Sequence, residues 1–409
     1  MSWGGILMTK KYFWNIGWVA LPLTLAGCAG PTSPFGGVNP WDLVNHADTL
    51  IPSDESTQVQ ASPIERNLSN AQWEYLKAQQ QPDKPWVLME PREINYINPV
   101  VLRIYIHDPQ NHGQRPRIRL TYDDWDLTSK IKNKDHWQKI STEDWQFTSS
   151  RIKFSPSRIG ELKVSFHSHS SHQWVSNQLV EPHCAFDVGD TPLENQYYAL
   201  KGLQQTGRFQ VEPALLAKIE NLAWDQKLNP NLLAALIAQE SAFNPRAVSM
   251  AKAIGLTQIT PMAEVQISNV HPEFPRFPGL NQFSFMRLMT LVKMQEIGPE
   301  QEWRLDPEQS IRGGITYLNM VRNYWNKVGH NRIPAALQPS EKSLNQQEVL
   351  ALTLASYNSG PSRIRRAYLQ SPKNWLKDDN LQEARTYVHK ISSYCANFSG
   401  QPSRSVGEK

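Results

Sequence analysis

The sequence predicts a multidomain protein in which a small all-β, sandwich-like domain is followed by an all-α domain. Between residues 93 and 190, apolar and polar residues alternate in short runs that are typical of strands. From residue 194 to about residue 400, apolar residues recur instead at helical spacing. The chain of 409 residues, 40% of them hydrophobic, is long enough to bury two separate cores.

The first 27 residues have the layout of a signal peptide. Lys10 and Lys11 precede an apolar run over residues 12–25, which is shorter than the roughly 20 residues that a membrane-spanning helix needs. Met8 is an alternative start that would leave a signal of more usual shape. Cleavage is expected directly before Cys28.

The segment LAGC, residues 25–28, resembles a bacterial lipobox, in which the cysteine becomes the lipidated first residue. This resemblance implies a lipoprotein anchored through Cys28. Because Ala29 rather than aspartate follows, it also implies an outer-membrane lipoprotein that faces the periplasm. The alternative is a secreted protein whose cleavage site happens to contain cysteine.

Residues 28–92 are predicted to form a flexible tether with a short helix at about residues 67–80, because the tether is rich in Pro, Gly, Ser and Asn. The net charge of +4 suits an anionic polymer. It is too small and too evenly spread to indicate nucleic acid, and no nucleic-acid-binding motif is present. A disordered tail is expected over residues 401–409.

The strands of the β module, residues 93–190, are predicted from four alternating runs, separated by turn sequences such as DPQNHG and SPSRIG. The module is expected to space or position its neighbour, or to bind glycan or a protein partner, such as one in cell-wall synthesis or division. The apolar positions of the four runs are Leu102, Ile104 and Ile106; Ile118, Leu120 and Tyr122; Leu162, Val164 and Phe166; and Cys184, Phe186 and Val188.

A histidine cluster in the β module raises the alternative of a zinc site, because alternate strand residues share a face. Its composition is that of a polar loop edge and its spacing fits no standard motif, so we expect no metal. Cys184 and Cys395 either pair in an oxidising compartment or remain separate thiols. The cluster consists of His167, His169 and His172, with His183 and Cys184 nearby.

The helices of the second domain are indicated by their apolar stripes and their capping residues. Asp306 and Pro307 form a helix start, and Gly360 with Pro361 a helix stop. Further helices are expected around residues 283–297, 350–357 and 382–395. The stripes that precede and follow the start signal are Leu215, Leu216, Ile219 and Leu222, and Ile311, Ile315, Leu318 and Trp325.

A helix from Pro230 to Asn244, capped by Asn229, carries an acid on its apolar stripe. Leu233, Leu236 and Ile237 share that stripe with Glu240. Burial disfavours a charged carboxylate, so the pKa of Glu240 is expected to rise towards neutrality, where it can donate a proton. The alternative is a glutamate at the rim of the core that pairs with lysine or arginine.

Four motifs in order resemble the catalytic domain of soluble-type (SLT) lytic transglycosylases, relatives of goose-type lysozyme with a lysozyme-like fold. The resemblance covers about half of the chain. The motifs are Glu240-Ser241; Gly255-Leu256-Thr257-Gln258; Ser356-Tyr357-Asn358-Ser359-Gly360; and Glu383, Ala384, Tyr387 and Val388.

The resemblance implies cleavage of peptidoglycan, in cell-wall turnover or remodelling, without a cofactor. Glu240 would protonate the bond between N-acetylmuramic acid and N-acetylglucosamine, then act as a base, so that a 1,6-anhydro ring closes without water. Ser241 and Gln258 would orient groups around the acid. Tyr357 and Asn358 would hold the substrate, Tyr387 would close the site, and Glu383 would be a buried supporting group.

Two departures from the family pattern are present: Thr257 replaces a methionine that packs beside the sugar, and residues 267–305 form a longer segment that could become a lid or wall. Three alternatives remain. A hydrolytic muramidase would want a second acid, for which Asp306 and Glu264 are candidates. A penicillin-binding protein is suggested by Ser249-x-x-Lys252 and Ser356-x-Asn358, but its K-T-G motif is missing. The third is a non-catalytic, peptidoglycan-binding lipoprotein.

Overall fold

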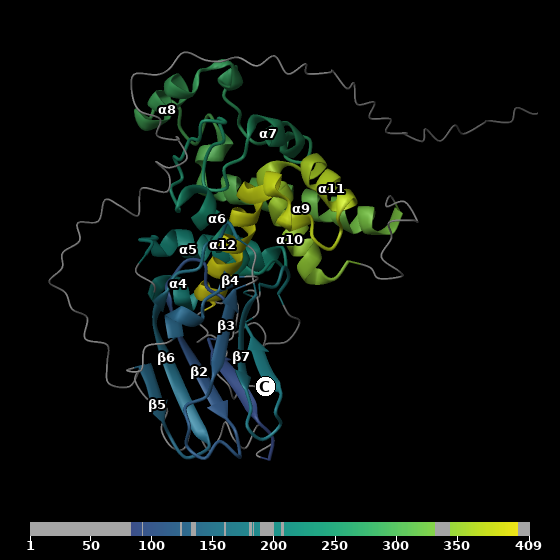
Figure 1. The fold of residues 1–409 in the computed structure, drawn as a ribbon. Coiled ribbons are helices and arrows are strands. Elements are labelled where there is room, and N and C mark those ends of the chain that lie inside the picture. The colour runs from purple at the N-terminus through teal and green to yellow at the C-terminus, as the bar shows by residue number, and fades with distance from the viewer. Residues whose placement is uncertain are drawn as a thin grey trace, which may run out of the picture. The chain divides into compact units, whose positions relative to one another are not determined.

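The computed structural model describes residues 83–91, 93–122, 125–131, 136–158, 161–179, 182, 184–188, 200–205, 208–331 and 344–399 (Figure 1). The predicted signal peptide, Cys28, the tether up to residue 82, His183 and the tail over residues 401–409 lie outside the described residues. None of the described helices is both long and apolar enough to cross a membrane.

The β module contains two four-stranded antiparallel sheets. The first has the order β1-β2-β6-β5, with β1 (Trp86–Glu90), β2 (Val100–His107), β6 (Asp144–Ile152) and β5 (Trp137–Lys139). The second has the order β4-β3-β7-β8, with β4 (Trp125–Asp126), β3 (Ile118–Tyr122), β7 (Leu162–His167) and β8 (Trp174–Gln178). Side chains from both sheets form one apolar core.

Alternation predicted the inner faces of this module correctly, because successive strand residues point to opposite sides. The first three predicted runs lie in β2, β3 and β7, and they all contribute to the shared core. The fourth run is wrong as a strand, since residues 184–188 form a single isolated bridge, Asp187 to Leu228. β1 also begins at Trp86, before the expected boundary at residue 93.

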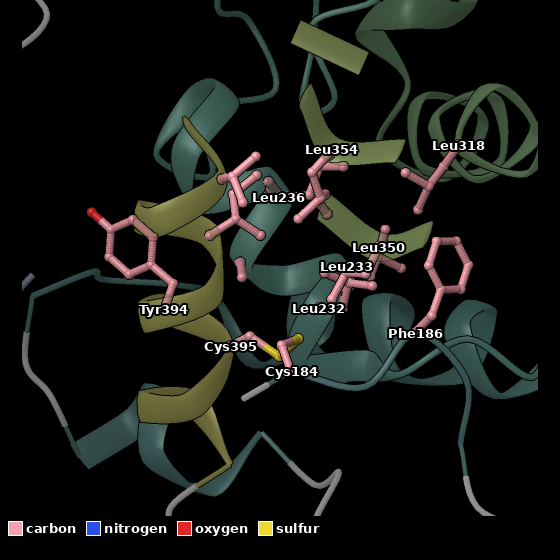
Figure 2. Packing of buried hydrophobic residues seen from close by; sticks show 14 of the residues in the cluster. Cys184, Phe186, Leu232, Leu233, Leu236, Leu318, Leu350, Leu354, Tyr394 and Cys395 are labelled. Carbon is pink, nitrogen blue, oxygen red and sulfur yellow. A yellow bond between two sulfur atoms is a disulfide. The ribbon is translucent and has the colours of Figure 1, made fainter. Parts of the chain in front are cut away.

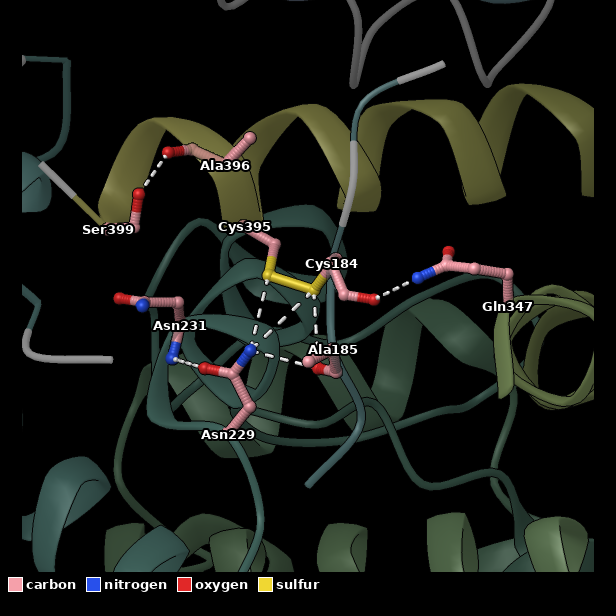
Figure 3. Close-up of a disulfide and its surroundings, with 8 residues drawn as sticks. All are labelled: Cys184, Ala185, Asn229, Asn231, Gln347, Cys395, Ala396 and Ser399. Atoms are coloured by element: carbon pink, nitrogen blue, oxygen red, sulfur yellow. Dashed lines mark hydrogen bonds between the residues drawn. A yellow bond between two sulfur atoms is a disulfide. The ribbon is translucent and has the colours of Figure 1, made fainter. Parts of the chain in front are cut away.

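Residues 184–188 contribute to the helical core instead of the β core (Figures 2 and 3). Cys184 forms a disulfide with Cys395, and their Cα atoms are 5.9 Å apart. This pairing decides between the two states that the sequence left open. The Asn229 amide donates a hydrogen bond of 2.9 Å to the Ala185 carbonyl beside the disulfide. The segment thereby connects to both the start of α6 and the end of α12.

The second domain is helical around α6 (Pro230–Ser241), which is buried over most of its length rather than along one stripe (Figure 2). α12 (Gln382–Phe398) packs along α6. Most predicted helices are confirmed, but α11 was not predicted, because Pro361 ends one helix and begins the next. The remaining helices are α4 (Lys201–Gln205), α5 (Pro213–Asp225), α7 (Pro261–Ser268), α8 (Phe285–Lys293), α9 (Pro307–Asn331), α10 (Gln346–Ser359) and α11 (Pro361–Gln370).

The long segment over residues 267–305 builds a small core of its own. α8 directs Leu288 and Val292 towards Ile254, Leu280 and other apolar residues of this cluster. The helix is shorter than the predicted 283–297, because Ser284 caps its start and Met294 ends it. A role as a lid or wall stays a prediction.

The β module contacts α12 directly. The rings of Tyr96 and His389 stack with centroids 4.6 Å apart. His389 Nδ1 lies 2.8 Å from the Pro156 carbonyl oxygen, and Ser393 Oγ accepts a bond from the Tyr96 amide. Burial lowers the pKa of His389 to about 4, although the bond to Pro156 opposes the shift. His389 is therefore neutral near pH 7, with Nδ1–H donating to the carbonyl.

Candidate active site

The end of α6 places Glu240 at the edge of the helical core. The helix begins as predicted, because Asn229 accepts a bond of 3.0 Å from the Asn231 amide and Pro230 occupies the first position. The prediction that it runs to Asn244 is wrong. It ends at Ser241, since Ala242 and Phe243 adopt left-handed φ angles of 50° and 64°.

Glu240 meets a tyrosine rather than a cation. The Tyr387 hydroxyl on α12 donates a hydrogen bond of 2.5 Å to Glu240 Oε1. Burial of the carboxyl raises the pKa of Glu240 to about 8, while the Tyr387 bond opposes the rise. No basic side chain pairs with Glu240 in the part of the chain that the structure describes. The paired-rim alternative therefore does not hold there, and the carboxyl is protonated at pH 7.

A second tyrosine, Tyr357, lies near this carboxyl, and a third, Tyr317, packs against Tyr357. The Tyr357 hydroxyl, at the end of α10, donates a bond of 2.8 Å to the Thr257 carbonyl, and the Tyr317 ring lies 5.2 Å from the Tyr357 ring. Burial first, and the charge of Glu240 second, raise the pKa of both Tyr357 and Tyr387 well above 10. Both hydroxyls therefore stay protonated and serve as donors. Sequence reasoning missed Tyr317, which no motif contains.

The second motif forms a loop, residues 255–259, that we call the motif loop. Ser241 Oγ donates to the Leu256 carbonyl at 2.8 Å and so ties the end of α6 to this loop. The Gln258 amide donates to the carbonyls of Ala247 and Gly255 at 3.1 and 2.9 Å. Ser241 and Gln258 thus shape the loop beside Glu240, and their contact with substrate stays a prediction.

Gly255 is required where the motif loop passes the backbone of residue 304. Its φ is +82°, and a Cβ there would lie 1.9 Å from the Arg304 carbonyl oxygen. Arg304 in turn donates from Nη1 to the Ile259 carbonyl at 3.4 Å, and from Nε to the buried Glu302 carboxylate at 2.7 Å. No sequence motif indicates this buried ion pair behind the loop.

Thr257 is fully buried against α9. Its Oγ1 donates to the Ser310 carbonyl at 2.8 Å, and a Cβ added to Gly314 would lie 2.5 Å from Thr257 Cγ2. The side chain thus packs between the motif loop and α9, where a methionine would need more room. Its carbonyl, rather than its side chain, connects to the site through Tyr357.

Asn358 lies beside the site at the end of α10, whereas Glu383 points away from it. Asn358 follows Tyr357 at the end of α10, and its Oδ1 accepts a bond of 2.9 Å from Ser359. Glu383 is exposed on the first turn of α12, so the expectation of a buried group is wrong. The stripe of α12 that includes Ala384 and Tyr387 faces inward, and helical spacing turns residue 383 away from it.

The two candidate acids for a hydrolytic mechanism are engaged elsewhere. Asp306 Oδ1 accepts the Gln309 amide at 2.8 Å and caps α9. Glu264 Oε1 accepts a bond of 2.8 Å from Ser268 and lies 3.8 Å from an Arg276 nitrogen.

The penicillin-binding interpretation is wrong. Lys252 Nζ donates to the Asn281 carbonyl at 2.9 Å, and Ser249 Oγ accepts from the Ala253 amide. Over residues 200–205, 208–331 and 344–399 there is no strand from which the required sheet could form. Within the described ranges, no group of three His, Cys, Asp or Glu residues could hold a metal ion.

The comparison with protein families decides the assignment of the helical domain. The model of the Transglycosylase SLT domain family matches residues 217–271 and 277–380. The helical domain belongs to the SLT family. The short interruption of the match falls within the long segment over residues 267–305. The match confirms the resemblance to this family.

Two relatives of this chain are named lytic murein transglycosylases. Membrane-bound lytic murein transglycosylase E of Buchnera aphidicola is 30% identical over 42% of this chain and 66% of its own length. Membrane-bound lytic murein transglycosylase F of Vibrio campbellii is 28% identical over 29% of this chain and 24% of its own length. The chain thus spans less than two thirds of either relative.

A solved structure is similar over part of its length. An inactive mutant of lytic transglycosylase Slt from Pseudomonas aeruginosa shares 23% identity, with a TM-score of 0.30. The match covers 44% of this chain and 23% of that chain.

Proposed function

We propose that this protein is a peptidoglycan lytic transglycosylase that cleaves the β-1,4 bond between N-acetylmuramic acid and N-acetylglucosamine. The observation that carries the proposal is the Glu240 carboxyl, which lies among tyrosines and stays protonated at neutral pH. A protonated carboxyl can act as a general acid on a glycosidic oxygen. The SLT assignment and the murein transglycosylase names of the relatives support this substrate class.

In the first step, the Glu240 carboxyl donates its proton to the glycosidic oxygen, and the bond from that oxygen to the anomeric carbon breaks. Tyr387 is bonded to Oε1, so Oε2 is the oxygen that faces this reaction. The acetamido group of the substrate stabilises the cationic centre. Glu240 is left as a carboxylate, and the Tyr387 hydroxyl stabilises its charge.

In the second step, the Glu240 carboxylate takes the proton of the muramoyl 6-hydroxyl. The oxygen then bonds to the anomeric carbon, which closes the 1,6-anhydro ring, consumes no water and restores the starting protonation state. One carboxyl therefore serves as acid and then as base. Tyr357 and Asn358 are proposed to hold the acetamido and ring substituents, and Ser241 and Gln258 to orient groups around the acid. No cofactor takes part.

We also propose that Cys28 carries a lipid that holds the enzyme at the outer membrane, facing the periplasm. The membrane-bound names of the relatives support a place in the cell envelope. Anchoring beside the wall would raise the effective concentration of the SLT domain near its polymer. Metabolic labelling of Cys28 with a clickable fatty acid tests this, with Cys28→Ala as the control that should remain unlabelled.

Product mass tests the reaction. Purified sacculi are digested with the wild-type chain and with Glu240→Gln, and the released muropeptides are weighed. We expect anhydro ends from the wild type and at least a hundredfold less product from Glu240→Gln, because general acid–base help is worth about 10²- to 10⁴-fold. Reducing ends, one water heavier, together with loss of activity in Glu264→Gln, would establish a hydrolase instead. Wall binding without any cleavage would leave a non-catalytic lipoprotein.

A further inference from the structure

The outer face of the second sheet, at one end of β7 and β8, combines an exposed indole with cations and hydroxyls. Register pairs His167 with Trp174 and Ser165 with Ser176 across β7 and β8. Arg119 faces Ser165 from β3, and the Arg117 carbonyl accepts a bond from the His167 amide. We call this surface the Trp174 face; it consists of Arg117, Arg119, Ser165, His167, Trp174 and Ser176.

The Trp174 face is solvent-accessible, and the sheet that carries it is packed on its other side. The alternate residues Val164 and Phe166 are fully buried against the first sheet, which fixes the orientation of the outward side chains. Trp174 is 57% exposed, although an indole can bury a large apolar area. The His167 ring stands perpendicular to it, 5.7 Å between centroids, and supports the indole from the neighbouring strand.

A buried carboxylate fixes the hairpin that presents Trp174. Asp108, 1% exposed, accepts bonds from the hydroxyls of Ser168 and Ser170 and from the amides of His169 and Ser170. All of these donors lie in the turn between β7 and β8. Because the turn is already held in one conformation, less conformational entropy is lost when a ligand binds.

The charges of the Trp174 face favour an anionic ligand. Arg117 and Arg119 are exposed, and no carboxylate among the described residues forms an ion pair with them. Among the described residues of this outer surface, the acidic ones, Asp126 and Glu161, lie towards the opposite end of the strands. A ligand for this end should therefore offer carboxylates to the arginines, hydroxyls to the serines and a flat apolar face to the indole.

We propose that the Trp174 face is a second, non-catalytic binding surface for peptidoglycan strands. A sugar ring has an apolar face that can cover an indole, and the carboxylates of the stem peptides match the arginines. The choice of this polymer rests on the proposed function. The surface would hold the wall independently of the Glu240 site.

The chain contains a matched control. Trp125, in edge strand β4 of the same sheet, is also 57% exposed, but the Arg158 guanidinium lies over its ring at 4.0 Å from the centroid. One face of Trp125 is thus already occupied. Substitution of Trp125 removes an equal exposed indole from the same sheet without touching the Trp174 face.

The test uses the full-length chain in detergent, with Glu240→Gln in all variants so that the wall stays intact, and measures sedimentation with purified sacculi. We expect Trp174→Ala to weaken binding about tenfold, because aromatic anchors carry a large share of binding energy at interfaces. Trp174→Phe should restore most of it, and Trp125→Ala should stay within about twofold of the parent. Equal losses for Trp174→Ala and Trp125→Ala, or no loss for Trp174→Ala, would overturn the proposal.

Two additional measurements distinguish peptidoglycan binding at the Trp174 face from membrane binding and from the proposed enzymatic function. Loss of binding by Trp174→Ala to anionic phospholipid vesicles, with sacculus binding unchanged, would assign the face to a membrane and overturn it. In the chain with intact Glu240, Trp174→Ala should release anhydro products from short soluble glycan fragments at the wild-type rate. Absence of such products from the wild type would refute the proposed function and leave the sacculus result standing.

Discussion

Glu240 and Glu302 both lie within the SLT domain, the first partly and the second fully buried, but they have different partners. Glu302, 1% exposed, accepts a charged bond of 2.7 Å from Arg304 and the amide of Phe277 at 3.3 Å. Glu240 has only the neutral hydroxyl of Tyr387 in the described structure. The difference shows that burial alone does not decide the role of an acid: a cation makes Glu302 part of the scaffold, and a tyrosine leaves Glu240 able to hold and release a proton.

The motif loop connects the two glutamates. Arg304 binds the carbonyl of Ile259 at one end of the loop, while Tyr357 and Ser241 bind the carbonyls of Thr257 and Leu256. The Glu302–Arg304 pair thus holds the Ile259 end of the loop, and Tyr357 and Ser241 hold the part of the loop beside Glu240. Replacing the glutamate by glutamine should therefore change the stability of the protein in opposite directions at Glu302 and at Glu240.

The largest effect on stability is expected from Glu302→Gln. It removes the negative charge and leaves the Arg304 guanidinium buried beside a neutral amide, which costs about 3–5 kcal/mol when one partner of a buried pair is lost. Urea unfolding measures the loss. The double variant Glu302→Gln/Arg304→Met should recover much of it, because no uncompensated charge remains. A loss below about 1 kcal/mol for the single variant would remove the scaffold role.

The same substitution at Glu240 should have the opposite sign. The folded pKa of about 8 lies above the unfolded value of 4.5, so the folded state binds more protons between these values and the protein loses stability as pH rises from about 4.5 to 8. Glu240→Gln removes that loss. We expect equal stability at pH 4 and a gain of about 4 kcal/mol at pH 8. Urea midpoints at the two pH values measure it, and a variant that is less stable at pH 8 would contradict it.

Two adjacent glycines of α9 test the motif loop itself. A Cβ on Gly314 would lie 2.5–2.8 Å from Thr257, whose carbonyl holds Tyr357, whereas a Cβ on Gly313 would meet the Trp303 ring at 2.3–2.4 Å. Each alanine variant should cost about 1–3 kcal/mol of stability through overpacking.

Their activities should differ. Gly314→Ala is expected to lower kcat several-fold more than Gly313→Ala, because it displaces the loop that positions Tyr357. Anhydro-muropeptide release under conditions where both variants are folded measures this. Equal kcat values would show that the contact between Thr257 and Gly314 is purely structural.

Local signals in the sequence were sufficient for much of the fold. The pairs Asn229-Pro230 and Asp306-Pro307 cap the helices that they were expected to begin. Period-2 alternation identified β2, β3 and β7, because their inner faces are buried. The same period misled at residues 184–188, where the alternate apolar residues pack against helices and form a disulfide.

The candidate site could be predicted only in part. Glu240 was found from its helical spacing, which is local, and the resemblance supplied Tyr387 and Tyr357. Tyr317, the Glu302–Arg304 pair and the left-handed end of α6 were missed, because each depends on tertiary contacts that no spacing encodes. Exposure of Glu383 likewise depends on how α12 is rotated against α6.

The smallest effect is expected from Tyr387→Phe. This substitution removes the hydrogen bond to Glu240 without changing any charge. The Tyr387 hydroxyl stabilises ionised Glu240, so its loss should raise the pKa of Glu240 further above its usual range. A net hydrogen bond is worth about 0.5–1.5 kcal/mol, which corresponds to a shift of at most about one pH unit.

In the proposed mechanism the basic limb of kcat/KM requires protonated Glu240, so in Tyr387→Phe this limb should move to higher pH. The control is Tyr394→Phe, two turns along the same helix, which should leave the limb in place. A limb that moves to lower pH would mean that Tyr387 stabilises the protonated acid instead. The Tyr387 hydroxyl would then assist the first proton transfer, in which Glu240 acts as the acid, rather than the second, in which it acts as the base.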